Sequence, residues 1–421
     1  MKPSMMFAAS LFALATPATA QERPDLPPDP VVARVLDTHP MVEAAGADVD
    51  AARADARMLK KGPHEVILSG SYIRRSVDRE GDFDEFDGTV SRAFRLPGKA
   101  RLDREAGSLG IEEADNNRED ARHQTALMLM NAWHDWLLAG ALARNDMAAV
   151  ANYERLLGAV ERRVELRDAA RLDAEQARSE LALAKTRLAN SESDLRAARA
   201  RLRATFPDLP LPDAPLPPAT PELPHAGLDR LHDLVIERSH EIRAAEFRAD
   251  RFDVLGRRAL RDRTADPSFG VRLFSERGGA ERGTGVVFSM PLGGGYRSAA
   301  ADKAVAEASR ARLELVNTRR EVMATADADL SNAATRFAAW QASAEAVRGA
   351  ESAANLSHRG YAGGVTDLSD LLYIDRQAIA ARREEIAARI AALRAIMKLR
   401  VDSHDIWAPD EKQSDATPQG S

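Results

Sequence analysis

The sequence predicts a mainly helical protein with a small β part, built from a unit of helix, two strands, long helix and helix that occurs twice. Three observations support this fold class. No proline stands between Pro97 and Pro207, and apolar residues in that stretch follow the 3-4 spacing of a coiled coil. The same series of elements returns in the second half of the chain. Aromatic residues make up only 5% of the chain, which suits long packed helices better than a globular enzyme.

Residues 1–20 predict a secretory signal peptide. Lys2 gives a positive first region, 5–15 are mostly apolar, and Ala18-Thr19-Ala20 has the small residues of a cleavage site. The apolar run is shorter than the ~20 residues that span a bilayer, which argues against a membrane anchor. Residues 21–30 contain four prolines and predict an extended tether.

Residues 31–205 form the first predicted unit. A helix covers 31–61, with a break or a late start at Pro40, because proline fits a first helical turn but disturbs a helix interior. The segments 65–74 and 88–95 have strand character and predict a hairpin with a long, acidic loop, 75–87.

The longest predicted element of this unit is a helix over 99–164. Its apolar residues form two rows with a spacing of seven: Leu129, Trp136, Ala143, Val150, Leu157 and Val164, and Ala126, Trp133, Gly140 and Met147. At 1.5 Å per residue, ~65 residues of helix span roughly 95–100 Å. Such a rod must pack against other rods, and a return helix with leucines at 181, 188, 195 and 202 follows it.

A linker with eight prolines, 206–226, separates this unit from the second, 227–402. The second unit has predicted strands at 268–275 and 283–290, followed by a helix over 296–357 and a return helix. The rows predicted to pack in the long helix are Val316, Met323, Leu330, Phe337 and Ala344, and Ala326, Ala333, Trp340 and Val347. Residues 403–421 are polar and predict a disordered tail.

Composition and motifs exclude several functions. The net charge of −6 gives no electrostatic case for nucleic-acid binding. The nine histidines form no metal-ligand spacing; His123 and His134, eleven residues apart, are too distant on a helix to share one ion, and scattered surface positions are expected. The glycine-rich segments match no phosphate loop, and no catalytic constellation is evident. We therefore predict no enzyme activity, no cofactor and no metal site.

The four predicted strands of one chain can form a membrane pore only if several chains combine their strands. An open sheet edge is a liability, and lipid offers an unpaired backbone no hydrogen-bond partner. Each strand of ~8–10 residues approaches the ~9–11 that a tilted transmembrane strand needs. Three chains would close a twelve-strand barrel, although two or four chains fit the strand count as well. A small soluble β-domain on a coiled-coil stalk is the alternative.

The segment Phe94-Arg95-Leu96-Pro97-Gly98-Lys99-Ala100-Arg101, with the duplicated unit and the proline-rich linker, resembles the TolC family of outer-membrane efflux proteins, and most of all its CzcC-like, heavy-metal branch. The resemblance covers 31–400. It implies a homotrimer whose α-helical barrel is continuous with a twelve-strand transmembrane β-barrel, four strands from each chain. Such a protein is the passive exit duct of a tripartite system in the outer membrane of a Gram-negative bacterium. Its partners are outer-membrane lipid, a periplasmic adaptor and an inner-membrane transporter of the RND type.

The family's adaptor-docking tips correspond to the two helical turns, 164–172 and 360–366. The residues that the resemblance assigns to them are Arg167, Asp168 and Ala169, and Gly360, Tyr361, Gly363, Gly364 and Thr366. The first turn departs from the family, because a glycine is usual at 166–168. Asp367 and Asp370 match the acidic residues that narrow the family's periplasmic end, where a carboxylate ring favours cations. Helix capping explains the same two aspartates equally well.

A periplasmic coiled-coil adaptor or scaffold without a pore is the alternative function. Such an adaptor has one helical hairpin with a lipoyl-like β-domain, whereas this chain has two hairpins with a strand pair each. Metal cations and drugs both stay open as substrates.

Overall fold

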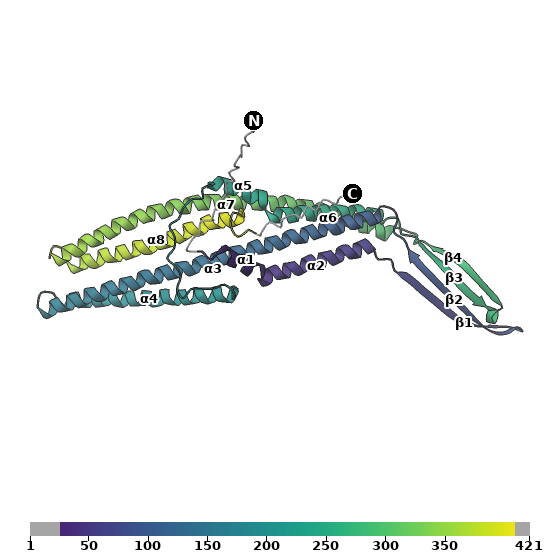
Figure 1. Ribbon diagram of the computed structural model, residues 1–421, viewed down its shortest axis with the longest axis horizontal. Coiled ribbons are helices and arrows are strands. Elements are labelled where there is room, and N and C mark those ends of the chain that lie inside the picture. Colours follow the sequence, from purple (N-terminus) through teal and green to yellow (C-terminus); the bar gives the residue numbers. More distant parts are fainter. Residues whose placement is uncertain (1–25, 409–421) are drawn as a thin grey trace, which may run out of the picture.

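The computed structural model describes residues 26–408 as an elongated body, helical along most of its length, with a β-sheet at one end (Figure 1). The predicted signal peptide, residues 21–25 of the predicted tether and 409–421 of the predicted tail lie outside the described residues. Within 26–408, no helix combines the length and the apolar composition that crossing a bilayer requires.

The elements repeat in the predicted order. They are α1 (Asp29–Asp37), α2 (Pro40–Lys61), β1 (Val66–Val77), β2 (Gly81–Ala93), α3 (Lys99–Glu165), α4 (Arg171–Thr205), α5 (Leu228–Arg238), α6 (His240–Arg261), β3 (Ser268–Glu276), the 3-10 turn η1 (Arg277–Gly279), β4 (Glu281–Ser289), α7 (Gly295–Ala362) and α8 (Leu368–Asp402). The predicted break at Pro40 is confirmed, and it recurs between α5 and α6 at Ser239. The sequence did not assign α5.

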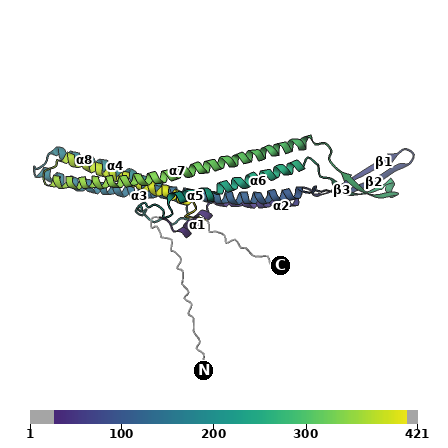
Figure 2. The same ribbon diagram turned by 90° about the horizontal axis from the view of Figure 1, so that it is seen from above.

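Helices α3 and α7 run the whole length of the helical body (Figures 1 and 2). Near the sheet, neighbouring helices follow the order α2, α3, α6 and α7; toward the other end the order is α4, α3, α8 and α7. Every cross-section therefore contains about four helices, as many as the strands in the sheet. In each of these two helical layers, the first and the last helix in the order have one side without a neighbour among the described residues.

The main core lies at mid-length, where α3 meets α1, α4 and α8. Leu129 and Trp136 are fully buried there and Trp133 is nearly so, as the predicted rows require. Met147 is 56% exposed, and Val316 and Met323 of α7 are 43% and 50% exposed, so these predicted packing positions have no partner among the described residues of one chain. A heptad row marks a face that suits a partner, and within one chain the outer side of α7 has none. Ala326 and Ala333, in the second row of α7, are fully buried.

All four strands form one antiparallel sheet in the order β1-β2-β3-β4. Pairing of β2 with β3 joins the two units, from Phe86 opposite Ser275 to Ala93 opposite Ser268. The predicted loop 75–87 was wrong, because β1 and β2 stay paired as far as Val77 opposite Gly81. Acidic residues suggested a loop, but opposite charges on adjacent strands stabilise a sheet, and Arg74 and Arg75 pair with Asp82 and Glu85 at 3.2 and 2.6 Å.

The chain after α8 departs from the predicted tail, which was wrong for its first residues. Ser403 and Trp407 are buried, and the Arg122 guanidinium donates a hydrogen bond to the Trp407 carbonyl at 2.7 Å. The aromatic side chain gives this segment enough apolar area to pack against the mid-length core. Ile406 and Trp407 therefore belong to the packed body of the protein.

Candidate functional site

The sheet has two chemically different faces. One face, here called the apolar face, carries ten large apolar side chains that are 48% to 82% exposed. They are Val66, Leu68, Tyr72, Phe86, Val90, Phe269, Val271, Leu273, Val286 and Phe288. A sheet of a water-soluble domain covers such a face with its core. Here no described helix or loop covers it, as Figure 1 shows for the sheet that extends beyond the helices.

Aromatic side chains lie at both ends of the apolar face. Tyr72 and Phe86 are in contact near the hairpin end, with ring centroids 5.2 Å apart. Phe269 contacts both Phe94 and Phe288 near the helical end, at 6.2 and 5.1 Å. Aromatic girdles that flank an apolar band are typical of strands in an outer membrane.

The opposite face of the sheet is largely polar. Arg75 pairs there with Glu85, and Arg272 pairs with Asp87. Phe274 also lies on this face, over Gly283, where an added Cβ would lie 2.3 Å from the ring. The sheet can therefore present one side to lipid and the other to water.

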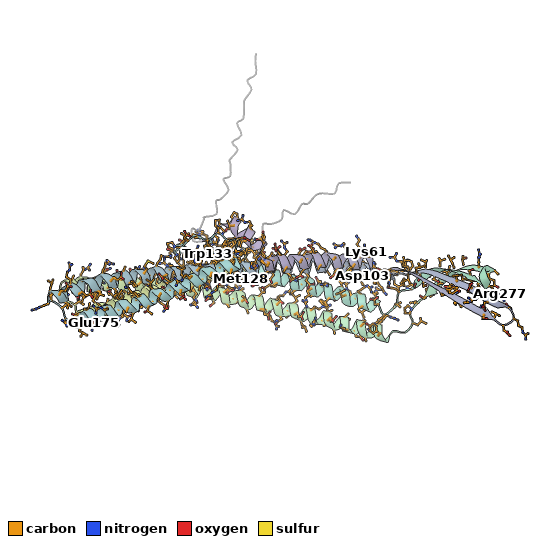
Figure 3. All side chains as sticks on the ribbon, turned by 90° about the horizontal axis from the view of Figure 1, so that it is seen from below. Lys61, Asp103, Met128, Trp133, Glu175 and Arg277 are labelled. Atoms are coloured by element: carbon orange, nitrogen blue, oxygen red, sulfur yellow. The ribbon has the colours of Figure 1, made fainter. Side chains whose placement is uncertain are left out.

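A charged cluster fixes the sheet to the helices. Lys99 is only 2% exposed, and its Nζ lies 2.7 Å from Asp266 Oδ1 and 2.9 Å from Asp262 Oδ1. Arg95 and Arg258 both contact Asp103, each at 2.6 Å. Figure 3 places Asp103 where the helices meet the strands.

The same cluster sets the charge state of Asp266. Burial alone would raise the pKa of this carboxyl, but hydrogen bonds from Lys99, His64 and the Leu96 amide lower it to about 2. The carboxylate therefore stays ionised at any ordinary pH and joins β1, α3 and the start of β3.

The two helical turns lie together at the end of the body opposite the sheet (Figure 1). In the first turn, Arg167 adopts a left-handed φ of 61°, which explains how the chain turns where the family has a glycine. Arg163 Nε contacts Asp168 Oδ2 at 2.8 Å, and the guanidinium lies 5.0 Å from the Tyr361 ring centroid. A cation–π contact thus links the first tip to the second.

The second turn begins later than predicted, because α7 includes Gly360 and Tyr361. The Gly360 carbonyl accepts hydrogen bonds from the amides of Val365 and Thr366, at 2.8 and 3.2 Å. A Cβ at Gly360 would lie 2.3 Å from Thr366 Oγ1, so glycine permits this close approach. Gly364 takes a φ of 72°, which glycine adopts without strain.

The tips also expose apolar residues that sequence reasoning missed. Leu166, Leu172 and Val365 are 73%, 66% and 88% exposed. The sequence contained a signal for this exposure, because an apolar residue within a short polar turn cannot reach the hydrophobic core. Exposed apolar side chains on a tip that polar residues surround are typical of a protein-binding surface.

Asp367 and Asp370 are both exposed at the second tip. Asp367 Oδ1 accepts a hydrogen bond from the Asp370 amide at 2.8 Å, so Asp367 is the N-cap of α8. Capping leaves its second oxygen available, so a cap and a carboxylate ring are compatible.

The expectation of scattered surface histidines was wrong for His134, which is 2% exposed, and for three others that lie close together. His123 of α3, His240 of α6 and His404 meet at mid-length, with ring centroids 5.8 Å apart for His123–His404 and 4.8 Å apart for His240–His404. Burial lowers the pKa of both His240 and His404 to about 4. Among residues 26–408, no group of three His, Cys, Asp or Glu side chains has the arrangement of a metal site. No sequence spacing signals this cluster, because its members come from three distant segments.

Comparisons with known proteins identify the fold. No family model matches the sequence, and no relative is found among curated proteins. The solved structure of CusC, a protein studied for transmembrane channel formation, has a TM-score of 0.73 and 15% identity, and the alignment covers 89% of this chain and 91% of CusC. The outer-membrane protein VceC from Vibrio cholerae has a TM-score of 0.72 and 17% identity, over 89% of this chain and 95% of VceC.

The Campylobacter jejuni CmeC outer-membrane channel has a TM-score of 0.71 and 13% identity, over 97% of this chain and 95% of CmeC. These similarities span nearly all of each chain and confirm the predicted mainly helical fold with a four-stranded sheet.

Proposed function

We propose that the protein is an outer-membrane channel of the TolC family, the passive exit duct of a tripartite efflux system in a Gram-negative bacterium. The observation that carries this proposal is the four-stranded sheet with an uncovered apolar face and a polar face, at the end of a long helical body. The fold shared with outer-membrane channels supports it.

Three copies of the chain form the pore. The sheet has two unpaired edges among the described residues, β1 and β4, and a membrane leaves no such edge open. The set of helices next to the sheet also ends in uncovered side chains, with Leu313 of α7 71% exposed and Met58 of α2 68% exposed. A homotrimer joins α7 of one chain to α2 of the next and closes a twelve-strand barrel on a twelve-helix tube.

The helical tips dock a periplasmic adaptor, which connects the duct to an inner-membrane transporter of the RND type. Leu166, Leu172 and Val365 give the adaptor an apolar surface, supported by the hydrogen-bonded turn at Gly360. Asp367 and Asp370 of three chains form a carboxylate ring at the periplasmic entrance, which favours cations. The cap on α8 fixes the position of Asp367 in that ring.

The CzcC-like junction at 94–101 favours heavy-metal cations as the substrate, and drugs are the alternative substrate class. A deletion strain challenged with metals and with drugs tests this part. Sensitivity to metals alone supports the CzcC-like branch, whereas sensitivity to drugs alone contradicts it.

Membrane fractionation followed by unheated gel electrophoresis tests the duct against the alternative, a periplasmic coiled-coil adaptor or scaffold without a pore. The duct predicts a detergent-extracted outer-membrane protein that migrates as a trimer and dissociates on heating. Recovery as a monomer in the soluble periplasmic fraction would contradict the proposal and favour the scaffold.

A further inference from the structure

Positive charge is concentrated where the helices meet the sheet. We define the basic belt as residues 57–65, 92–105, 257–266 and 295–303, the ends of four helices and their connections to the strands. It contains fourteen Lys and Arg and six Asp and Glu, in a chain whose net charge is −6.

The charge is local to the belt. The two hairpins next to it, 66–91 and 267–294, contain six basic and eight acidic residues. The adjacent turns on the helical side, 50–56, 106–113, 250–256 and 304–310, contain three basic and seven acidic residues. The belt is therefore a positive band between two acidic regions.

Only part of this charge serves the fold. Arg95, Lys99 and Arg258 are largely buried and bind carboxylates of the junction cluster. Seven other basic side chains are exposed and form no ion pair within the described residues. These seven are Arg57, Lys60, Lys61, Arg92, Arg101, Arg104 and Arg261. Glu65 is an exposed carboxylate in the belt that likewise lacks an ion pair within 26–408.

The belt adjoins the apolar face. Arg92 lies opposite Phe269 in the register, at the helical end of that face. Tyr296, within the belt, is 89% exposed, and Leu292, just before the belt segment 295–303, is 91% exposed. Figure 3 places Lys61 where the helices meet the strands and Arg277 at the far end of the sheet. Lys and Arg next to exposed aromatic and apolar side chains are typical of a membrane–water interface.

We propose that the basic belt binds the anionic headgroups of phospholipids in the leaflet that faces the helical body. This inference rests on the proposed function, which places the apolar face in a bilayer and so brings the belt to headgroup depth. Seven exposed cations without an ion pair among the described residues, against the one such carboxylate Glu65, complement a layer of phosphodiester anions. Each cation near such a surface strengthens binding about fivefold. The acidic residues on either side confine the contact to one leaflet.

Lipid binding by the purified full chain in an uncharged detergent tests the proposal. Fluorescent phosphatidylglycerol is the probe, and unlabelled phosphatidylglycerol, phosphatidylcholine, lipopolysaccharide and inorganic phosphate are competitors. The belt variant combines Lys60→Gln, Lys61→Gln, Arg101→Gln and Arg104→Gln. A control variant removes four exposed arginines elsewhere on the helical body that form no ion pair within the described residues, by Arg201→Gln, Arg203→Gln, Arg320→Gln and Arg348→Gln.

We expect phosphatidylglycerol to bind at least about tenfold more tightly than phosphatidylcholine, and the belt variant alone to lose this preference. Equal loss in the control variant, or competition by lipopolysaccharide or free phosphate as strong as that by phosphatidylglycerol, would overturn the proposal. If the belt variant does not assemble, the native chain alone tests the proposal. Added salt screens the charges and must then abolish its preference for phosphatidylglycerol over phosphatidylcholine. Conductance of the native chain in a planar bilayer separates the two proposals: a conducting channel without lipid preference contradicts only the belt, whereas failure to insert contradicts both.

Discussion

Gly140 shows how one residue sets the contact between α3 and the proline-rich linker. A Cβ at this position would lie 2.0 Å from Pro215 Cγ, and Arg144 donates a hydrogen bond to the Pro215 carbonyl at 2.8 Å. Glycine in a helix interior is unfavourable by roughly 0.5–1 kcal/mol relative to alanine. The close approach of the linker explains why glycine stands at position 140 of this 67-residue helix.

Gly140→Ala should lower the free energy of unfolding by about 1–3 kcal/mol, because the added methyl group overpacks the contact with the linker. Gly158→Ala is the matched control in the same helix, since no atom lies within 4 Å of its Cβ position. It should raise stability by roughly 0.5–1 kcal/mol. Denaturant unfolding followed by circular dichroism measures both changes, and an equal effect of the two substitutions would refute the contact.

Two substitutions of Asp367 distinguish a helix-capping role from a gating role. Asparagine keeps the N-cap acceptor and removes the charge, whereas alanine removes both. If Asp367 and Asp370 form a cation-selective ring, Asp367→Asn with Asp370→Asn should weaken cation selectivity as much as the double alanine variant does. Ion selectivity in a planar bilayer measures this. An asparagine variant with the native selectivity would leave capping as the whole role.

At the scale of the elements, the mid-length core joins segments that are far apart in the sequence. The segment after α8 is held by Arg122 at the Trp407 carbonyl and by Arg238 at the Ser403 carbonyl, at 2.7 and 3.1 Å. His404 stacks on His240 beside it. The chain's last described residues thus connect α3, α5 and α6 to α8.

Acidification should destabilise this region. Burial holds the pKa of His240 and His404 at about 4 in the folded chain, below the usual 6.5, so the unfolded chain binds more protons between these values. Stability is therefore greatest above pH 6.5 and falls as the pH drops toward 4, by about 1–3 kcal/mol per histidine. Thermal unfolding across this range measures the effect. His404→Gln should reduce the slope and His225→Gln, at an exposed position, should not; equal slopes would contradict it.

Elements whose partners lie in the same chain could be predicted from the sequence. The row from Leu129 to Trp136 was correct because α3 is packed from several sides. For Val316 and Met323 the prediction stays untested, because both are exposed in one chain and a heptad row does not say whether its partner is in the same chain. The strands at 75–87 were missed because charge was taken as a sign of a loop.

The candidate sites also divide into residues that local sequence predicts and residues that only the fold brings together. Turn residues such as Gly364 could be predicted, because tight turns have local chemical requirements. The histidine cluster and the basic belt could not, since both depend on which distant segments the fold brings together. Only the fold turns four separate basic stretches into one band.

In the molecule as a whole, a single chain leaves several surfaces without a partner among the described residues. Its sheet has uncovered apolar side chains and unpaired edges among the described residues, and its helical layer ends in exposed Leu313 and Met58. Closure by two further copies pairs the sheet edges and covers the outer helices with one symmetry operation, and the proposed bilayer covers the apolar face. The central claim is therefore that the chain functions as a trimeric, water-filled tube.

Single-channel recording of the purified, trimeric protein in a planar lipid bilayer tests that claim most directly. We expect stepwise insertion events with a reproducible conductance, which heat dissociation of the trimer abolishes. Stable insertion without current, or a monomer that stays in aqueous solution and does not insert, would contradict it.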